Sequence, residues 1–268
     1  MKIFYSLLFS FLSLISYGQF FDFNKDVEWK GIEYKLSEDE KLRILSKINE
    51  DLFYYLKDNN LVKNNLEKFH FVNLNNDNLL DFIYVGYSGA EDQSTIAFIQ
   101  DEKGNYIKKF ETIGVIYEII SISILEPVLQ IKIIKNDDCY DCIGVKNSLT
   151  YLCINGDFKL IEALSFTKST TLPSLEFKKR FKVINPKYYL RSYPEIYNEG
   201  DKPDVLFGNV IAEYGSGIKG FAFSSQKDET GRTWWFVAIP AKDCSQSIFL
   251  NEKGYFLGWM SSNYLEEL

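Results

Sequence analysis

The chain has 268 residues and a net charge of −7, from 37 acidic and 30 basic residues. This acidic balance excludes a large nucleic-acid interface, because phosphates require a basic surface. Its 18 Tyr and 22 Phe indicate a β-rich protein, since aromatic side chains pack well on the pleated surface of a sheet.

The N-terminus has the features of a secretory signal peptide. Lys2 supplies one positive charge, an apolar run follows from Ile3 to Ile15, and small residues flank Tyr17 in Ser16-Tyr17-Gly18. The run is shorter than the roughly 20 residues that span a bilayer, and no later stretch reaches that length. We expect residues 1–18 to be cleaved, leaving an exported protein, periplasmic or extracellular, without a transmembrane segment. A buried N-terminal helix is the alternative.

Residues 19–166 are expected to form an α+β domain. Ser37 and Glu40 form the pattern of a capping box, and apolar residues from Leu45 through Ile48 and Leu52 to Leu56 recur at helical spacing. The pattern then changes to strands separated by turn residues at 101–105 and 155–157. The expected strands are 66–74, 81–87, 95–100, 106–112, 115–125, 128–134, 148–153 and 158–166. This order predicts one helix followed by an antiparallel β-meander.

An oxygen-rich turn separates the first two expected strands. Oxygen ligands would come from positions 1, 3, 5, 7 and 9 of this loop, which are Asn73, Asn75, Asp77, the carbonyl of Leu79, and Asp81. Alternate residues of a tight loop converge on one point, as a hard cation such as calcium requires. The turn is therefore a candidate calcium site.

The same turn, within residues 69–87, resembles the calcium loop of FG-GAP repeats. That resemblance implies a structural calcium site, although Asn73 replaces an aspartate that is usual in the family. An EF-hand is excluded because Tyr84 stands at position 12, where a bidentate Glu is required. The alternative is an ion-free turn in which Asn and Asp side chains bond their own backbone.

Four cysteines, Cys139, Cys142, Cys153 and Cys244, are disulfide candidates in an exported protein. Their pairing stays open, because four cysteines allow three connectivities. A redox role for the Cys139–Cys142 pair is less favoured, since neighbouring aspartates oppose a thiolate. A zinc site is a third interpretation, but the spacing is irregular and the compartment oxidising.

The sequence provides few groups for hydrolytic chemistry. His70, in an alternating strand context, is its one histidine. A Ser-His-Asp triad would have to use this residue, and a zinc hydrolase needs several histidines or a set of His and Glu ligands. No glycine-rich phosphate loop occurs. A pair of carboxylates of the glycosidase kind stays open, because such a pair is arranged in space and not in sequence. We therefore expect a protein that is not an enzyme.

Residues 182–268 carry three motifs, after an expected linker at 167–181. Residues 189–194 read Tyr-Leu-Arg-Ser-Tyr-Pro, residues 234–237 read Trp-Trp-Phe-Val, and residues 258–265 read Gly-Trp-Met-Ser-Ser-Asn-Tyr-Leu. In this order they resemble the bacterial Src-homology-3-like (SH3b) domain. The resemblance implies an all-β SH3-like barrel used for binding.

Aromatic side chains of this segment are the candidate ligand-binding residues. Aromatic anchors dominate recognition surfaces, so we expect Tyr193, Tyr197, Trp234 and Tyr264 to line a peptide groove. The alternative is that most of them are core and corner residues. The stretch from 240 to 255, with Cys244, is longer than the family's hairpin and is a second place where specificity could reside.

These features predict an exported, non-catalytic binding protein of the bacterial cell envelope. Its expected partner is a protein or a cell-wall peptide or glycan, and calcium is the one cofactor considered. The first alternative is an inhibitor or immunity-type protein that binds a secreted effector. The second is a cell-wall-acting enzyme with the C-terminal domain as a targeting module.

Overall fold

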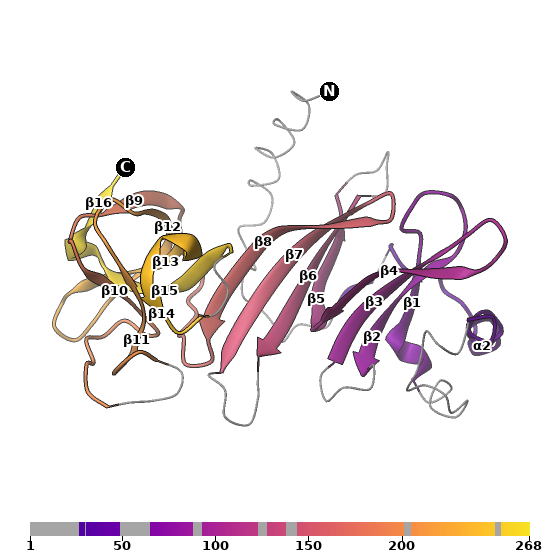
Figure 1. Ribbon diagram of the computed structural model, residues 1–268, viewed down its shortest axis with the longest axis horizontal. Helices are drawn as coiled ribbons and strands as arrows, with labels where there is room; N and C mark the ends of the chain where they lie inside the picture. Colours follow the sequence, from indigo (N-terminus) through magenta and orange to yellow (C-terminus); the bar gives the residue numbers. More distant parts are fainter. Residues whose placement is uncertain are drawn as a thin grey trace. The chain divides into compact units, whose positions relative to one another are not determined.

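The computed structural model describes residues 27–29, 31–48, 65–87, 93–122, 128–137, 144–200, 205–249 and 253–268 (Figure 1). The expected signal peptide, Cys139 and Cys142, and the helix positions Leu52 and Leu56 lie outside these residues. Within the described ranges, no helix is long and apolar enough to cross a membrane.

Hydrogen bonds join the strands into two sheets, of four and twelve strands. The smaller sheet is antiparallel, in the order β1 (Phe69–Val72), β2 (Asp81–Tyr87), β3 (Gln93–Gln100) and β4 (Tyr106–Ile113). The larger sheet runs β16 (Leu265–Glu267), β9 (Lys179–Val183), β12 (Lys219–Lys227), β13 (Thr233–Pro240), β15 (Tyr255–Ser261), β8 (Asp157–Thr167), β7 (Val145–Ile154), β6 (Val128–Asp137) and β5 (Val115–Ser121). Off this path, β10 (Tyr188–Arg191) pairs with β11 (Val210–Tyr214) and β15, and β11 pairs with β14 (Cys244–Ser247).

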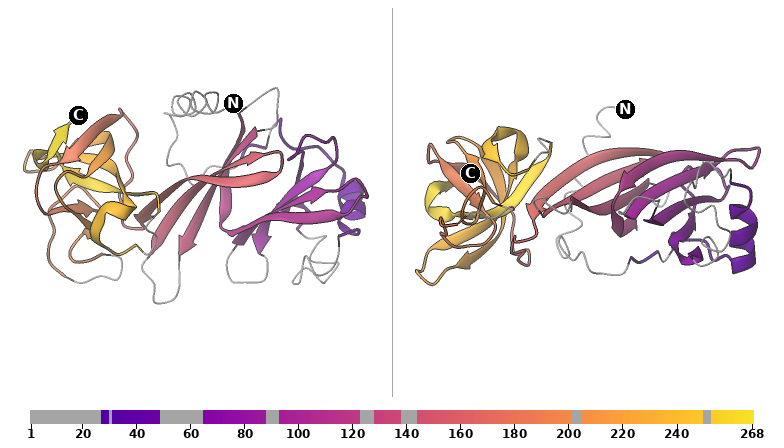
Figure 2. Two further views of the ribbon diagram at one scale, coloured as in Figure 1. Left: turned by 45° about the horizontal axis from the view of Figure 1, so that its top comes forward. Right: turned by 60° about the horizontal axis from the view of Figure 1, so that its bottom comes forward.

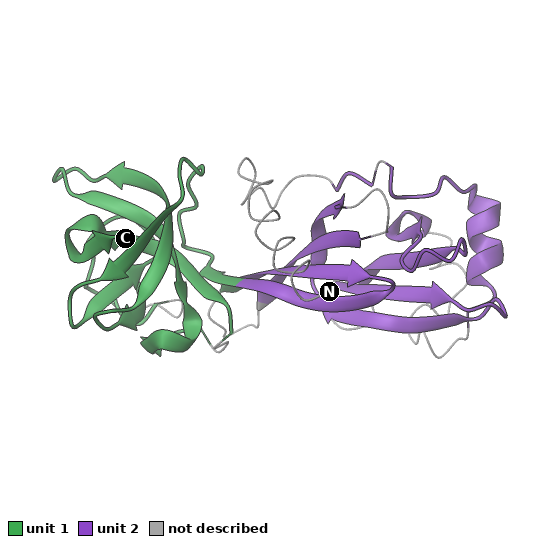
Figure 3. Ribbon diagram, turned by 90° about the horizontal axis from the view of Figure 1, so that it is seen from above, with its two compact units in different colours: residues 1–23, 137–146, 164–268 green, residues 24–136, 147–163 purple. Residues whose placement is uncertain are grey.

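The helical elements of the described residues are short. They are the α-helix α2 (Glu38–Leu45) and the 3-10 turns η2 (Leu66–Lys68), η3 (Ala241–Asp243) and η4 (Ser262–Tyr264). By contacts the chain divides into two compact units, with residues 137–146 and 164–268 in unit 1 and residues 27–136 and 147–163 in unit 2 (Figure 3).

The expected fold class, an α+β domain followed by a closed SH3-like barrel, is wrong. Strands dominate the described chain, and α2 has eight residues. The C-terminal strands do not close, because one edge of β15 pairs with β13 and the other edge is divided between β8 and β10. The first residues of β15 pair in parallel with Leu164 and Ser165 of β8, whereas Trp259 pairs with Arg191 of β10. The backbone groups that a barrel would use for closure therefore extend an open sheet.

In unit 2, β1, β2 and β3 are buried on both faces of their sheet, whereas the edge strand β4 is mostly exposed. Successive residues of a strand point to opposite faces, and both parities are apolar here. One face packs aromatic residues against α2, which lies beside this sheet (Figure 2). The other face packs aliphatic residues against β5 and β6. The aromatic layer consists of Phe69, Phe71, Phe82, Tyr84, Phe98 and Tyr106 around Ile44 and Leu45, and the aliphatic layer includes Val72, Ile83, Ala97, Ile116, Ile131 and Ile133.

The predicted start of the helix is confirmed. Ser37 Oγ accepts a hydrogen bond from the Glu40 amide at 3.3 Å, and the Glu40 carboxylate accepts one from the Ser37 amide at 2.8 Å. This reciprocal capping box satisfies two amides that have no partner within the helix. It fixes the residue at which α2 begins, and α2 then covers the aromatic layer.

Gly114 forms the corner between the two sheets of unit 2. It joins β4 to β5 with a φ of +122°, and a Cβ atom there would lie 2.7 Å from the Ile134 carbonyl oxygen. Only glycine combines that dihedral angle with such a close approach. The Gly114 amide and carbonyl remain bonded, to the Gln93 carbonyl at 2.8 Å and the Thr95 hydroxyl at 2.9 Å.

Unit 1 is also apolar on both sides of β13 and β15. Val237 and Ile239 of β13 contribute to one core cluster, while Trp234, Phe236 and Trp259 are fully buried at the opposite parity. Part of the expected linker lies along this second side. Trp259 Nε1 donates to the Thr171 carbonyl at 2.7 Å, and Thr167 and Thr170 are themselves buried.

Candidate functional site

The four aromatic residues expected to bind a ligand have different surroundings. Trp234 is fully buried, and its Nε1 donates to Asp228 Oδ2 at 2.8 Å across the β12–β13 hairpin. Tyr264 is 38% exposed and packs on Tyr188, with ring centroids 4.7 Å apart. The remaining pair, Tyr193 and Tyr197, lies on the loop that follows β10. We call residues 193–200 the tyrosine loop.

The tyrosine loop presents apolar side chains to solvent. Ile196 is 46% exposed and Tyr197 is 37% exposed, and Tyr193 is half-buried. The carboxylates of Glu195 and Glu199 are exposed on the same loop. Large apolar side chains that gather at the surface commonly mark a place where another molecule binds.

Arg191 holds the tyrosine loop from its buried side. Its Nη1 donates to the Tyr197 carbonyl at 3.1 Å and to Asn209 Oδ1 at 2.6 Å, and its Nη2 donates to Asn198 Oδ1 at 2.9 Å. The residue is 5% exposed. One guanidinium on a sheet strand thus fixes two consecutive residues of the loop.

Asn209, fully buried immediately before β11, also holds the loop, and we call Arg191 and Asn209 together the clasp. Asn209 Nδ2 donates to the carbonyls of Tyr193 at 3.2 Å and Glu195 at 2.9 Å, and its backbone amide donates to the Tyr197 carbonyl at 3.1 Å. Its own carbonyl accepts from the Ser192 amide at 2.9 Å. Every second residue from 193 to 197 is therefore bonded to one asparagine.

The charge of Arg191 is balanced by neutral oxygens. Burial lowers the pKa of its guanidinium, and the tyrosines nearby, Tyr188 foremost, oppose that shift. In the described residues, its bonds go to carbonyl and amide oxygens, and its Cζ lies 5.6 Å from the centre of the Tyr189 ring. A buried cation without a carboxylate partner is costly. The position of this cation beneath a surface loop favours a role in positioning that loop.

The predicted calcium turn is bonded to itself. Asn73 Oδ1 accepts from the Asn76 amide at 2.7 Å, and Asp77 Oδ1 accepts from the Leu79 amide at 2.8 Å. Asn76 and Asn78 adopt positive φ angles of 64° and 62°, which asparagine tolerates. These side-chain oxygens face backbone amides of the turn and not a common central point.

Asp81, which would complete the site, is fully buried and bonds two separate segments. Its Oδ2 accepts from the Leu74 amide at 2.7 Å and its Oδ1 from the Gln100 amide at 2.9 Å. Burial raises its pKa to about 6 against these bonds. The residues as arranged do not fit calcium, and the described chain contains no group of three metal-ligating acidic, His or Cys side chains. The geometry favours a structural turn.

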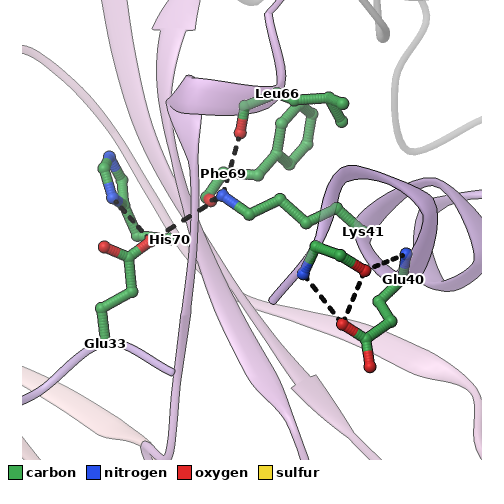
Figure 4. A network of polar contacts seen from close by, with 7 residues as sticks. Glu33, Glu40, Lys41, Leu66, Phe69 and His70 are labelled. Carbon is green, nitrogen blue, oxygen red and sulfur yellow. Dashed lines mark hydrogen bonds and ion pairs between the residues drawn. The ribbon is translucent and has the colours of Figure 1, made fainter. Parts of the chain in front are cut away.

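His70 belongs to a polar network on β1 (Figure 4). Its ring stacks on Trp29 with centroids 3.8 Å apart, and its Nδ1 lies 3.3 Å from Glu33 Oε1 without hydrogen-bond geometry. Burial lowers the pKa of His70 to about 4, so the ring is neutral at pH 7. Lys41 Nζ donates to the Phe69 carbonyl at 3.1 Å and lies 3.9 Å from Glu33. The network attaches the segment before α2, and α2 itself, to β1.

The expected disulfide bonding is wrong for the two cysteines that the structure describes. Neither Cys153 nor Cys244 forms a disulfide. Cys153 points into the aliphatic core of unit 2, where burial raises its pKa to about 12 and its thiol contacts the Leu74 carbonyl at 3.8 Å. A thiol in such surroundings packs as a small apolar group.

No family model matches the chain, and no curated protein or solved structure is significantly similar to it. The resemblances to SH3b and FG-GAP sequences therefore rest on their motifs alone. The site with the clearest geometry is the tyrosine loop with its buried clasp, Arg191 and Asn209.

Proposed function

We propose that the protein is an exported, non-catalytic binding protein of the bacterial cell envelope and that the tyrosine loop contacts its partner. The signal-peptide pattern at residues 1–18 supports export. The observation that carries the binding role is the combination of an exposed apolar loop with a buried clasp beneath it.

The clasp has a direct consequence for affinity. A loop that is ordered before binding loses less conformational entropy when a partner arrives. Ordering costs about 1–2 kcal/mol per residue, and the bonds of Arg191 and Asn209 meet this cost in the free protein. Ile196 and Tyr197 are then presented in one geometry, which suits recognition of a shaped surface.

Two substitutions test the role of the loop. The mature chain, residues 19–268, is tested for retention on purified peptidoglycan and for complexes with envelope proteins of the source bacterium. Ile196→Ala with Tyr197→Ala is expected to weaken the interaction at least about tenfold, because truncated anchor residues cost about 2 kcal/mol or more together. The clasp stays intact, since it uses only the backbone of Tyr197.

The matched control is Tyr87→Ala with Ile107→Ala. These side chains are 58% and 48% exposed, and they lie in unit 2. The control variant should bind like the wild type. Equal binding by the loop variant and the control, or no retention of the wild type in either assay, would contradict the proposal.

A further inference from the structure

The charges on the tyrosine loop bear on the chemistry of its partner, given the proposed function. Glu195 and Glu199 are exposed, and residues 193–200 contain no Lys or Arg. The Glu195 carbonyl is held by Asn209 Nδ2 at 2.9 Å, so the backbone that carries this carboxylate is fixed beside Ile196. The loop therefore combines an apolar centre with a negative rim.

Two described basic residues close to the loop in the chain, Arg191 and Lys187, already have partners of their own. Arg191 is 5% exposed, and its donors bond loop oxygens on the buried side. Lys187, on the segment before β10, pairs with Glu213 at 2.7 Å. Both cations thus have their own partners within unit 1, and within the described residues neither Glu195 nor Glu199 forms an ion pair, so both carboxylates can pair with a ligand of opposite charge.

We propose that the tyrosine loop binds a basic segment of a partner protein. Ile196 and Tyr197 form the apolar centre of the contact, and Glu195 and Glu199 pair with Lys or Arg at its edge. Specific interfaces commonly have such an apolar centre and a polar rim, and the rim charges select the partner and accelerate association. Anionic polymers and the carboxylates of wall peptides are repelled by the same rim.

A selection from random 12-residue peptides displayed on phage tests the sign of the partner. The mature chain, residues 19–268, is the target, and enriched peptides are synthesised and titrated by fluorescence anisotropy at low and high salt. We expect the enriched peptides to carry net positive charge. Glu195→Gln with Glu199→Gln should weaken their binding about fivefold at low salt and less at high salt, because exposed charge pairs contribute about 0.2–1 kcal/mol each and are screened.

The matched control is Glu176→Gln with Glu229→Gln, two exposed glutamates elsewhere in unit 1. It should bind the peptides like the wild type. Neutral or acidic enriched peptides, absence of enrichment, or equal binding by the Glu195/Glu199 variant would overturn the proposal. If only the Ile196/Tyr197 variant lost binding, the proposal of a basic partner would be overturned, whereas the proposed binding function would stand. Equal binding by all variants would overturn both.

Discussion

Asp81 in unit 2 and Asn209 in unit 1 have the same structural role, because the side chain of each hydrogen-bonds backbone groups of an irregular segment. Each is fully buried, and the segment precedes it in the chain, with Leu74 bonded by Asp81 and the tyrosine loop by Asn209. A short side chain with two polar atoms can replace the strand pairing that an irregular loop lacks. The cost of burying it is recovered only while all of its partners stay in place.

Asn209→Ala should therefore loosen the tyrosine loop. It removes an acceptor of Arg191 and both donors to the loop carbonyls, so we expect unit 1 to lose about 2–4 kcal/mol of unfolding free energy. Urea unfolding measures this change. Asn209→Asp keeps the acceptor for Arg191 and should retain more stability than the alanine variant. Wild-type stability of the alanine variant would show that the clasp contributes nothing.

Two large pKa shifts in unit 2, those of Asp81 and His70, contribute to its pH dependence in opposite directions. The pKa of Asp81 rises from 3.8 to about 6, so its contribution to the unfolding free energy is present below pH 4 and is lost as pH rises to 6. The pKa of His70 falls from 6.5 to about 4, so its contribution is present above pH 6.5 and is lost as pH falls to 4. These two slopes oppose each other in the wild type.

Single substitutions should separate the two slopes. In Asp81→Asn, the unfolding free energy of unit 2 should rise from pH 4 to 6.5, because of the two large opposing shifts only that of His70 remains. In His70→Phe, which keeps a ring to stack on Trp29, it should fall over the same range. Urea midpoints at several pH values measure both, with slopes up to about 1.4 kcal/mol per pH unit. Parallel profiles in the two variants would refute this assignment.

At the scale of elements, the Asn-rich turn between β1 and β2 follows its local chemistry. The oxygens that could ligate an ion already accept backbone amides. We therefore expect the melting temperature to be the same in excess calcium and in chelator. An increase with calcium, which the sequence resemblance implies, would show that the turn rearranges around the ion.

The β4–β5 corner depends on one residue. In Gly114→Ala, the added Cβ would lie 2.7 Å from the Ile134 carbonyl, and φ would stay at +122°. We expect unit 2 to lose at least about 2 kcal/mol of unfolding free energy through strain and overpacking. Thermal unfolding measures the loss, and Gly217→Ala, where a Cβ would meet nothing within 4 Å, controls for positive φ alone. Equal losses in both variants would argue against the close contact as the cause.

At the scale of the whole molecule, the strands were easier to predict than their partners. β2 spans Asp81–Tyr87, which is the range that alternation predicts, and hairpin turns lie at 101–105 and 155–156. The open sheet was missed because β15 pairs with β8, which precedes it by about ninety residues. Alternating apolar residues are required in a barrel and in an open sheet alike, so this pattern does not select between them.

The clasp was also beyond prediction from sequence. Arg191 stood in a recognised motif, but a buried arginine and a surface arginine look the same in a sequence. Asn209 gave no signal at all, because the loop groups to which it donates are backbone carbonyls 12 to 16 residues before it. Tyr197 is exposed and Tyr193 is half-buried, and their role in ligand binding stays a prediction, whereas burial of Trp234 depended on which face of β13 is covered.

Local patterns in the sequence determined what short-range physics controls: a capping box at Ser37, strands from alternation, and turns from Asn, Asp and Gly. The tertiary structure alone decided which strands pair, that the sheet stays open at β15, and that Arg191 and Asn209 clasp the tyrosine loop. The reason is that pairing and burial are set by competition among residues far apart in the chain, which periodicity within a segment does not report.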